Sequence, residues 1–207
     1  MDDPHPPFDP PLIAILRGIT PTEAAAHVDV LLEAGIGAIE IPTNSPEWAR
    51  SVAIAVAACG DRALVGAGTV LEPAHLDALQ ASGGRLVVTP NVRPALIRQA
   101  HERGLTIAAG CATASEAFDA LEAGAHMLKL FPASVYGPPL VRALRSVLPA
   151  VPLLAVGGIT PGNIGEYLAA GCNGAAIGGE LYRPGQAPAQ TLANARRFLA
   201  AWGEHSA

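Results

Sequence analysis

The sequence predicts a single α/β domain, an eight-stranded parallel (β/α)8 barrel (TIM barrel) over residues 11–207. Three observations support this prediction: the chain length, a repeat of helix, glycine and apolar run, and the even spacing of those runs. At 207 residues the chain fits one domain, at the short end of what such a barrel needs. Half of its residues are hydrophobic and only 15% are charged, which is sufficient for a large buried core.

One pattern recurs along the chain: an Ala/Leu-rich helical segment, a glycine, then a short apolar run. It appears as LLEAGIGAIEI (31–41), LQASGGRLVV (79–88), AHERGLTIAAG (100–110), LEAGAHMLKL (121–130) and YLAAGCNGAAIG (167–178). A glycine of each repeat stands where the helix should end, a position that favours left-handed φ. These glycines are Gly35, Gly83, Gly104, Gly124 and Gly171. The apolar runs do not alternate with polar residues, which is typical of parallel strands buried on both faces.

Eight strands are expected in total. They are predicted at 12–16, 38–41, 64–67, 86–89, 106–109, 127–130, 153–156 and 174–177. Their ends fall about 20 to 26 residues apart, the length of one compact βα unit. The even spacing and the lack of a second domain favour a closed barrel over an open doubly wound sheet. Helix starts are also predicted at Thr20-Pro21-Thr22-Glu23, which offers a cap and a first-turn proline, and at Thr160-Pro161.

Composition and charge exclude several classes of function. The formal net charge of −5 argues against a nucleic-acid partner or an acidic membrane surface. No apolar stretch reaches the roughly 18 residues of a membrane-spanning helix. The Pro-rich segment 1–10 has neither the basic nor the apolar region of a signal peptide. We therefore expect a cytoplasmic protein in which residues 1–10 form a flexible lead to the barrel.

Cysteine and histidine give no sign of a disulfide or a metal site. The three cysteines, Cys59, Cys111 and Cys172, are scattered and without a CxxC pair, as expected of reduced, buried thiols. Six histidines are present, but no HExxH motif joins them. Neither a metal nor a cofactor is expected.

Chemistry on such a barrel belongs at the C-terminal ends of the strands, and Lys129 is the clearest candidate there. It is the only lysine of the chain and stands inside the apolar run Met-Leu-Lys-Leu-Phe-Pro. A desolvated lysine beside another cation has a lowered pKa and can attack a ketone to form an imine, which arginine cannot do. From the residues alone, a structural ion pair or a strand-end lysine that reaches solvent is an equally good interpretation.

Three more polar residues stand at predicted strand ends. Glu40 lies in the apolar run Ala-Ile-Glu-Ile-Pro, where burial would raise its pKa into the range useful for proton transfer. Arg17 suits bidentate binding of a carboxylate, and Thr69 could add a hydroxyl to the same group. The alternatives are an Arg17–Glu40 salt bridge and a Thr69 side chain that caps a loop. A Lys129 that faces the same pocket favours a catalytic Glu40.

Glycine pairs follow the last two predicted strands, Gly157-Gly158 and Gly178-Gly179. Glycines there let backbone N–H groups approach a phosphate, with a helix N-terminus behind them. Tight turns alone are the alternative, but both pairs fall where phosphate sites recur in barrels. The sequence therefore predicts a phosphorylated ligand.

Several motifs in a fixed order match a known family. They are PLIAILRGITP (11–21), AIEIPTNSP (38–46), VGAGTVL (65–71), VVTPN (87–91), GCATASEA (110–117), LKLFPAS (128–134) and AVGGITP (155–161). Over about residues 11–202 the chain resembles the 2-keto-3-deoxy-6-phosphogluconate (KDPG) and KHG class I aldolase family. The resemblance is strongest to its 2-dehydro-3-deoxy-6-phosphogalactonate (KDPGal) branch.

The resemblance implies a homotrimeric barrel that cleaves a phosphorylated 2-keto-3-deoxy sugar acid to pyruvate and D-glyceraldehyde 3-phosphate, without a metal. Lys129 matches the Schiff-base lysine, and Glu40 matches the acid/base that works through a water. The pocket for the pyruvate carboxylate and its surroundings is matched by Arg17, Thr69 and Pro90, and a ring packed near the Schiff base by Phe131. The residues that match the phosphate cradle are Gly157, Gly158, Gly178 and Gly179.

Two positions separate the branches of this family. Gluconate-type members carry an arginine where this chain has Asn44, and a threonine where it has Val156. A hydroxyl at the second position can contact the C4 hydroxyl of the substrate and valine cannot, so the epimer preference should differ. Both residues resemble the galactonate branch, from whose usual forms Thr43 and Glu180 depart slightly.

Three alternative functions stay open. The first is the same chemistry on the gluconate epimer, or on both KDPG and KHG. The second is a barrel phosphosugar isomerase or decarboxylase, in which Lys129 acts as an electrostatic group. The third is a non-catalytic barrel that binds a phosphorylated metabolite.

Overall fold

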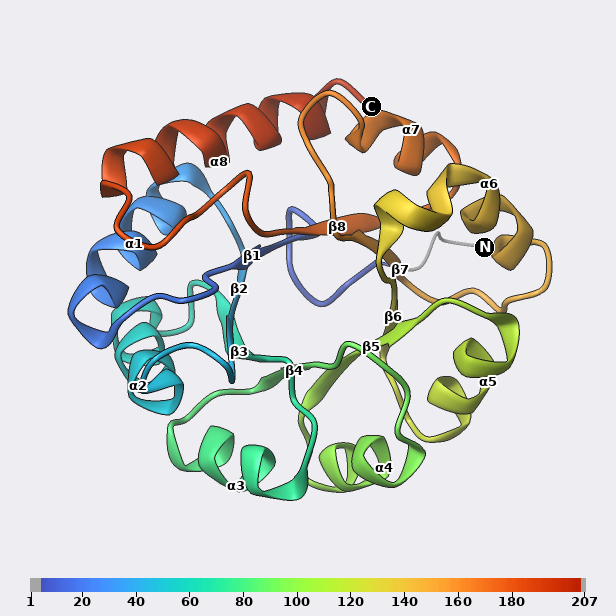
Figure 1. Ribbon diagram of the computed structural model, residues 1–207, viewed down its shortest axis with the longest axis horizontal. Helices are drawn as coiled ribbons and strands as arrows, with labels where there is room; N and C mark the ends of the chain where they lie inside the picture. The colour runs from blue at the N-terminus through green and yellow to red at the C-terminus, as the bar shows by residue number, and fades with distance from the viewer. Residues whose placement is uncertain (1–4, 206–207) are drawn as a thin grey trace.

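Eight parallel strands pair in the order of the sequence, and the last strand pairs with the first to close a barrel (Figure 1). The computed structural model describes residues 5–205. The strands are β1 (Leu12–Ile15), β2 (Ala38–Pro42), β3 (Leu64–Gly68), β4 (Leu86–Val88), β5 (Thr106–Cys111), β6 (Met127–Leu130), β7 (Leu153–Val156) and β8 (Gly174–Ile177). Each lies within a residue or two of its predicted range, so the barrel prediction is confirmed.

A helix follows each strand, and the helices form a ring around the barrel (Figure 1). They are α1 (Pro21–Ala34), α2 (Trp48–Cys59), α3 (Pro73–Ala81), α4 (Pro94–Glu102), α5 (Ala114–Glu122), α6 (Ala133–Arg145), α7 (Ile164–Ala169) and α8 (Pro188–Gly203). The glycines of the repeat end their helices as predicted, with φ between 71° and 112°. A non-helical Gly137 (φ 69°) interrupts α6.

One of the two predicted helix starts is confirmed and the other is wrong. Pro21 opens α1, and the Glu23 carboxylate accepts a hydrogen bond from the backbone N–H of Thr20 at 3.2 Å. Residues 161–163 form a turn instead, and α7 begins at Ile164. The backbone leaves the helical range at Asn163, whose φ is −119°, so the turn does not continue into α7. The Oδ1 of Asn163 accepts a hydrogen bond from the N–H of Thr160 at 2.8 Å and closes the turn.

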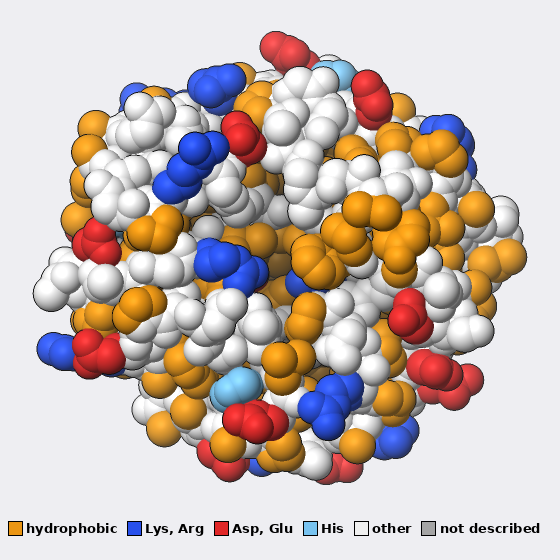
Figure 2. All heavy atoms as spheres, in the orientation of Figure 1, with side chains coloured by type: hydrophobic (Ala, Val, Ile, Leu, Met, Phe, Trp, Pro, Cys, Tyr) orange, Lys and Arg blue, Asp and Glu red, His pale blue; other side chains and the backbone are white. Residues whose placement is uncertain are grey.

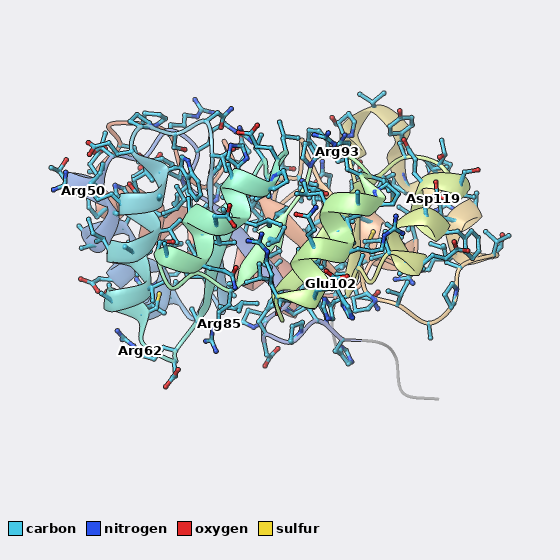
Figure 3. The ribbon with its side chains drawn as sticks, turned by 90° about the horizontal axis from the view of Figure 1, so that it is seen from below. Arg50, Arg62, Arg85, Arg93, Glu102 and Asp119 are labelled. Carbon is cyan, nitrogen blue, oxygen red and sulfur yellow. The ribbon has the colours of Figure 1, made fainter. Side chains whose placement is uncertain are left out.

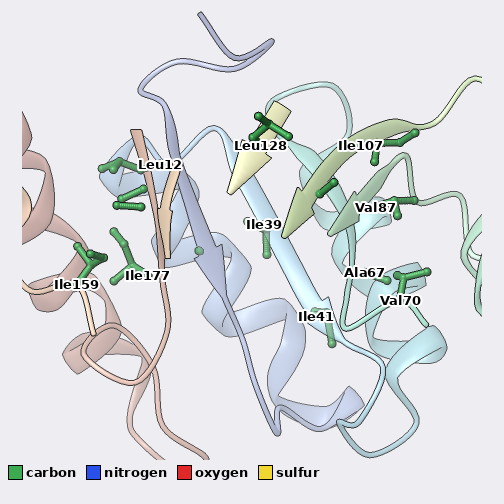
Figure 4. Packing of buried hydrophobic residues seen from close by; sticks show 14 of the residues in the cluster. Leu12, Ile39, Ile41, Ala67, Val70, Val87, Ile107, Leu128, Ile159 and Ile177 are labelled. Carbon is green, nitrogen blue, oxygen red and sulfur yellow. The ribbon is translucent and has the colours of Figure 1, made fainter. Parts of the chain in front are cut away.

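The core has two layers because each strand is covered on both faces. Figure 4 shows part of the larger layer, to which Leu12 and Val87 belong. Inside the barrel, small and medium side chains from many strands form one cluster, with Ile13, Leu86, Met127 and Leu154 among its largest members. A larger cluster fills the space between the strands and the helix ring. Charged side chains such as Arg50 of α2 stand on the outside of the ring (Figure 3). This pattern explains why the strand sequences are apolar without alternation.

Residues 7–9 lie at the N-terminal ends of the strands, where Phe8 packs against the inner cluster. The backbone of Asp9 approaches Gly37 so closely that a Cβ there would stand 2.8 Å from the Asp9 carbonyl oxygen. The predicted flexible lead spans 1–10, and residues 1–4 lie outside the described range. Its flexibility stays a prediction. Within residues 5–205, no helix has both the length and the apolar character needed to cross a membrane.

Candidate active site

A cavity of about 650 Å³ opens at the C-terminal ends of the strands. It is the hollow at the middle of the face in Figure 2, where Lys and Arg side chains stand on its border. Every predicted site residue except Asn44 lines it: Arg17, Glu40, Thr69, Pro90, Lys129, Phe131, Val156, Gly157, Gly158, Gly178 and Gly179. Residues from seven of the eight strand ends therefore meet in one place, as the barrel geometry requires.

Lys129 is buried in the wall of the cavity. It belongs to β6, is 6% exposed, and lies in register with Gly110 of β5. Its Nζ stands 4.9 Å from the centroid of the Phe131 ring. Burial lowers the pKa of the ammonium, the Glu40 charge opposes the shift, and the Arg17 charge adds to it, so that the pKa is about 8. A larger fraction of neutral amine is therefore available near neutral pH, as a nucleophile requires.

The interpretation of Lys129 as a surface-reaching or ion-paired side chain receives no support from the geometry. Among residues 5–205, the ion pairs closer than 4.0 Å do not include Lys129. The predicted alternative of an Arg17–Glu40 salt bridge is likewise not formed within that distance. Arg17 instead donates from Nη1 to Oδ1 of Asn44 at 2.9 Å. Asn44 thus acts on the cavity through Arg17.

Glu40 is a buried carboxyl with an unsatisfied oxygen. It is 2% exposed, and within the described residues its Oε2 has no hydrogen-bond partner. Burial raises its pKa and the charges of Lys129 and Arg17 oppose the shift, so that the pKa is about 7. A carboxyl that titrates near neutral pH can both accept and return a proton.

Gly68 makes room for this carboxyl. A Cβ at Gly68 would stand 1.7 Å from Oε2 of Glu40, so any other residue would displace the carboxyl group. Gly68 and Glu40 lie on neighbouring strands, where Glu40 pairs with Gly66 and Pro42 with Gly68. The sequence analysis missed this role, although the small-residue run of β3 beside an in-strand glutamate was a usable signal.

Thr69 has a left-handed backbone conformation with φ 56°, which is strained for a β-branched residue. Thr43 holds it there from the neighbouring strand end. The Thr43 hydroxyl donates to the Thr69 carbonyl at 2.6 Å, and the Thr43 N–H donates to the carbonyl of Gly68 at 2.8 Å. Thr43 therefore fixes the backbone that carries the pocket threonine.

The glycine pairs lie side by side at the ends of β7 and β8. Gly157 and Gly158 have φ of 95° and 75°, and a Cβ at Gly158 would stand 2.5 Å from the Cβ of Ser134. Within the described chain, none of the four N–H groups donates a hydrogen bond to a protein atom. Four free N–H groups at one end of a cavity are suited to bind an anion.

Several cavity residues were not predicted from the sequence. They are Ile15, Ile159, Ala176, Glu180 and Arg183. Arg183 follows Gly179 by only four residues, but no local pattern indicates the turn that returns its side chain to the cavity.

Comparisons with known proteins agree with this geometry. The KDPG and KHG aldolase family matches residues 9–192. The chain is 53% identical over 195 residues to the 2-dehydro-3-deoxy-6-phosphogalactonate aldolase of Escherichia coli strain K12, covering 94% of this chain and 95% of that one. A solved structure described as native KDPGal aligns with a TM-score of 0.96 at 51% identity, over 98% of both chains.

A more distant solved structure bears on the chemistry. It is the KDPG aldolase from Legionella pneumophila with pyruvate captured at low pH as a covalent carbinolamine intermediate. It is 25% identical to this chain, with a TM-score of 0.80, over 91% of this chain and 93% of that one.

Proposed function

Because the chain belongs to the KDPG and KHG aldolase family, we propose that it reversibly cleaves 2-dehydro-3-deoxy-6-phospho-D-galactonate to pyruvate and D-glyceraldehyde 3-phosphate. It is an aldolase, a carbon–carbon lyase. The observation that carries the proposal is the buried Lys129, whose pKa is lowered to about 8, in one cavity with Glu40 and Arg17. The covalent pyruvate adduct of the Legionella relative supports an imine mechanism.

The first half of the reaction builds an electron sink on Lys129. The neutral amine adds to the C2 ketone, and loss of water gives a protonated imine. Arg17 and Thr69 bind the carboxylate beside that carbon, and Pro90 closes the same wall of the pocket. The nearby Arg17 also disfavours a charged Lys129, which keeps part of the amine neutral before attack.

The second half breaks the C3–C4 bond. Glu40, through a water, accepts the proton of the C4 hydroxyl; the C3–C4 electron pair moves into the imine and leaves an enamine. D-Glyceraldehyde 3-phosphate departs with the new aldehyde. The enamine takes up a proton at C3, and hydrolysis of the imine frees pyruvate and Lys129. The glycine pairs hold the phosphate at the other end of the cavity.

The substrate epimer is predicted from Val156, which lines the cavity and offers no hydroxyl to the C4 group. We expect kcat/KM for pyruvate release to be about 10-fold or more higher with KDPGal than with KDPG. Val156→Thr should shift the ratio toward KDPG. Val88→Thr is a matched control because Val88 belongs to the same inner cluster but not to the cavity lining. An equal or reversed preference in the wild-type enzyme would leave an aldolase of KDPG or dual specificity.

Rival functions without an imine are tested by borohydride in the presence of pyruvate. The aldolase should gain the mass of a reduced pyruvate adduct. A phosphosugar isomerase or decarboxylase that uses Lys129 only as a charge would gain none, and neither would a barrel that only binds its ligand.

Chelation gives another test, because the protonated imine already supplies the positive charge that a metal would otherwise provide. Activity should be unchanged after incubation with EDTA. A loss of activity that a divalent cation restores would contradict the imine mechanism.

A homotrimer in the cytoplasm fits this function. Exposed hydrophobic side chains support a subunit interface, and they gather beside the cavity over α6 (Figure 2). Val135 is 73% exposed and Tyr136 is 43% exposed, which is unusual for neighbouring apolar residues. The oligomeric state can be measured by light scattering.

A further inference from the structure

The phosphate end of the cavity lacks a charge partner among the groups assigned so far. A phosphate monoester carries about −1.5 to −2 charges at pH 7. The glycine pairs offer N–H groups but no full positive charge. Glu180, next to Gly179, lines the same end and adds a negative charge. A positively charged side chain is needed here to offset the charges of the phosphate and of Glu180.

Three cations line the cavity within residues 5–205: Arg17, Lys129 and Arg183. The first two belong to the carboxylate end, because both act on Glu40 and Arg17 is bound to Asn44. Arg183 stands on the loop between β8 and α8, shortly after the second glycine pair. It is therefore the cation at the phosphate end.

The guanidinium of Arg183 already lies against the glycine pair. Its Nε donates to the carbonyl of Gly179 at 3.0 Å, and Nη2 stands 3.5 Å from Oε1 of Glu180. Of the three guanidinium nitrogens of Arg183, only Nε makes a hydrogen bond to a described residue. The side chain is 72% exposed, so its pairing with Glu180 is weak and can be exchanged for a stronger partner.

Buried side chains and hydrogen bonds fix the backbone of the loop that carries Arg183. Leu181 and Tyr182 are buried, and their N–H groups both donate to the carbonyl of Gly178. Gln186 accepts from the N–H of Arg183 at 3.2 Å and donates to the carbonyl of Leu181 at 2.8 Å. An anchored backbone holds the guanidinium at the cavity rim, so little ordering of the main chain is needed on binding.

We propose that Arg183 binds the terminal phosphate of the substrate, and that it leaves Glu180 for a phosphate oxygen when the substrate enters. Arg183 then selects phosphorylated over unphosphorylated substrates. This inference rests on the proposed aldolase function. Glu180 holds the guanidinium beside the glycine pair in the free enzyme.

Arg183→Ala tests the assignment through a phosphorylated and an unphosphorylated ligand. We expect KM for KDPGal to rise about 10-fold or more, because a charge-assisted contact is lost. The pyruvate concentration that gives half-maximal imine trapping by borohydride should not change, since pyruvate carries no phosphate. KM of the wild-type enzyme should also rise with ionic strength more steeply than KM of the variant.

Arg50→Ala is the matched control. Arg50 pairs with Glu47 at 3.2 Å with the same sequence spacing, is 67% exposed, and points away from the cavity at the edge of the molecule (Figure 3). An unchanged KM in Arg183→Ala, or an equal weakening for pyruvate and KDPGal, would overturn the role of Arg183 alone. A wild-type enzyme that traps no pyruvate would overturn the aldolase function and this inference together.

Discussion

Replacing Lys129 with arginine should lower kcat/KM for KDPGal cleavage by roughly 10⁴-fold or more, the scale on which loss of a covalent nucleophile acts in other enzymes. Arginine keeps the positive charge of the protonated side chain but cannot form an imine. The measurement is pyruvate release in a coupled assay. A variant with arginine that keeps substantial activity would show that the charge of residue 129 matters and the imine does not.

The adduct can be located without ambiguity, because Lys129 is the only lysine of the chain. After borohydride and pyruvate treatment, peptide mass analysis should place the added mass on Lys129 in the wild-type protein. Lys129→Met is a second variant for the case in which arginine prevents folding. It puts an uncharged side chain of similar length in the buried position. It should fold, form no adduct at residue 129 and be equally inactive.

Glu40→Gln should lower kcat by about 10²- to 10⁴-fold, the range for loss of a general acid–base group. Glutamine has the same shape but cannot accept the C4 hydroxyl proton. Trapping of pyruvate on Lys129 should persist, because the amine is still present. A variant that loses both cleavage and trapping would place Glu40 in imine formation and not in bond cleavage.

Glu40→Gln should lower activity but increase the stability of the folded chain at neutral pH. Burial raises the Glu40 pKa from 4.5 to about 7, so the folded chain holds this proton more tightly than the unfolded chain. The stability due to that proton is present below pH 4.5 and is lost as pH rises through about 7. Glu40→Gln should therefore gain stability relative to wild type between pH 5 and pH 8. Urea unfolding at the two pH values tests this; a constant difference would contradict the raised pKa.

The strands, most helix ends and about two thirds of the cavity lining could be predicted because they depend on local patterns. An apolar run after a helix-ending glycine marks a buried parallel strand wherever it occurs. Closure then brings the strand ends together, so Lys129 and Glu40 meet although they are far apart in sequence. The start of α7 was wrongly predicted because Thr160-Pro161 carries the local signal of a helix start. The backbone conformation of Asn163, with φ −119°, separates this turn from α7.

Local sequence patterns did not predict the contacts that Asn44, Thr43 and Arg183 make. Asn44 was predicted as a pocket residue, but its side chain contacts Arg17 outside the cavity lining. The hydrogen bond from Thr43 to the strained Thr69 joins two strand ends, and no spacing rule indicates it. The position of Arg183 depends on how its loop folds back over Gly178 and Gly179.

The sequence by itself determined the barrel and the position of Lys129, Glu40 and the two glycine pairs at its strand ends. Periodicity and a single in-strand lysine are properties of short segments, and short segments can be read directly. Only the tertiary structure decided the pKa values of Lys129 and Glu40, the space that Gly68 leaves for the carboxyl, and the place of Arg183 at the rim. These depend on burial and on distances between side chains from different strands, which exist only once the barrel has closed.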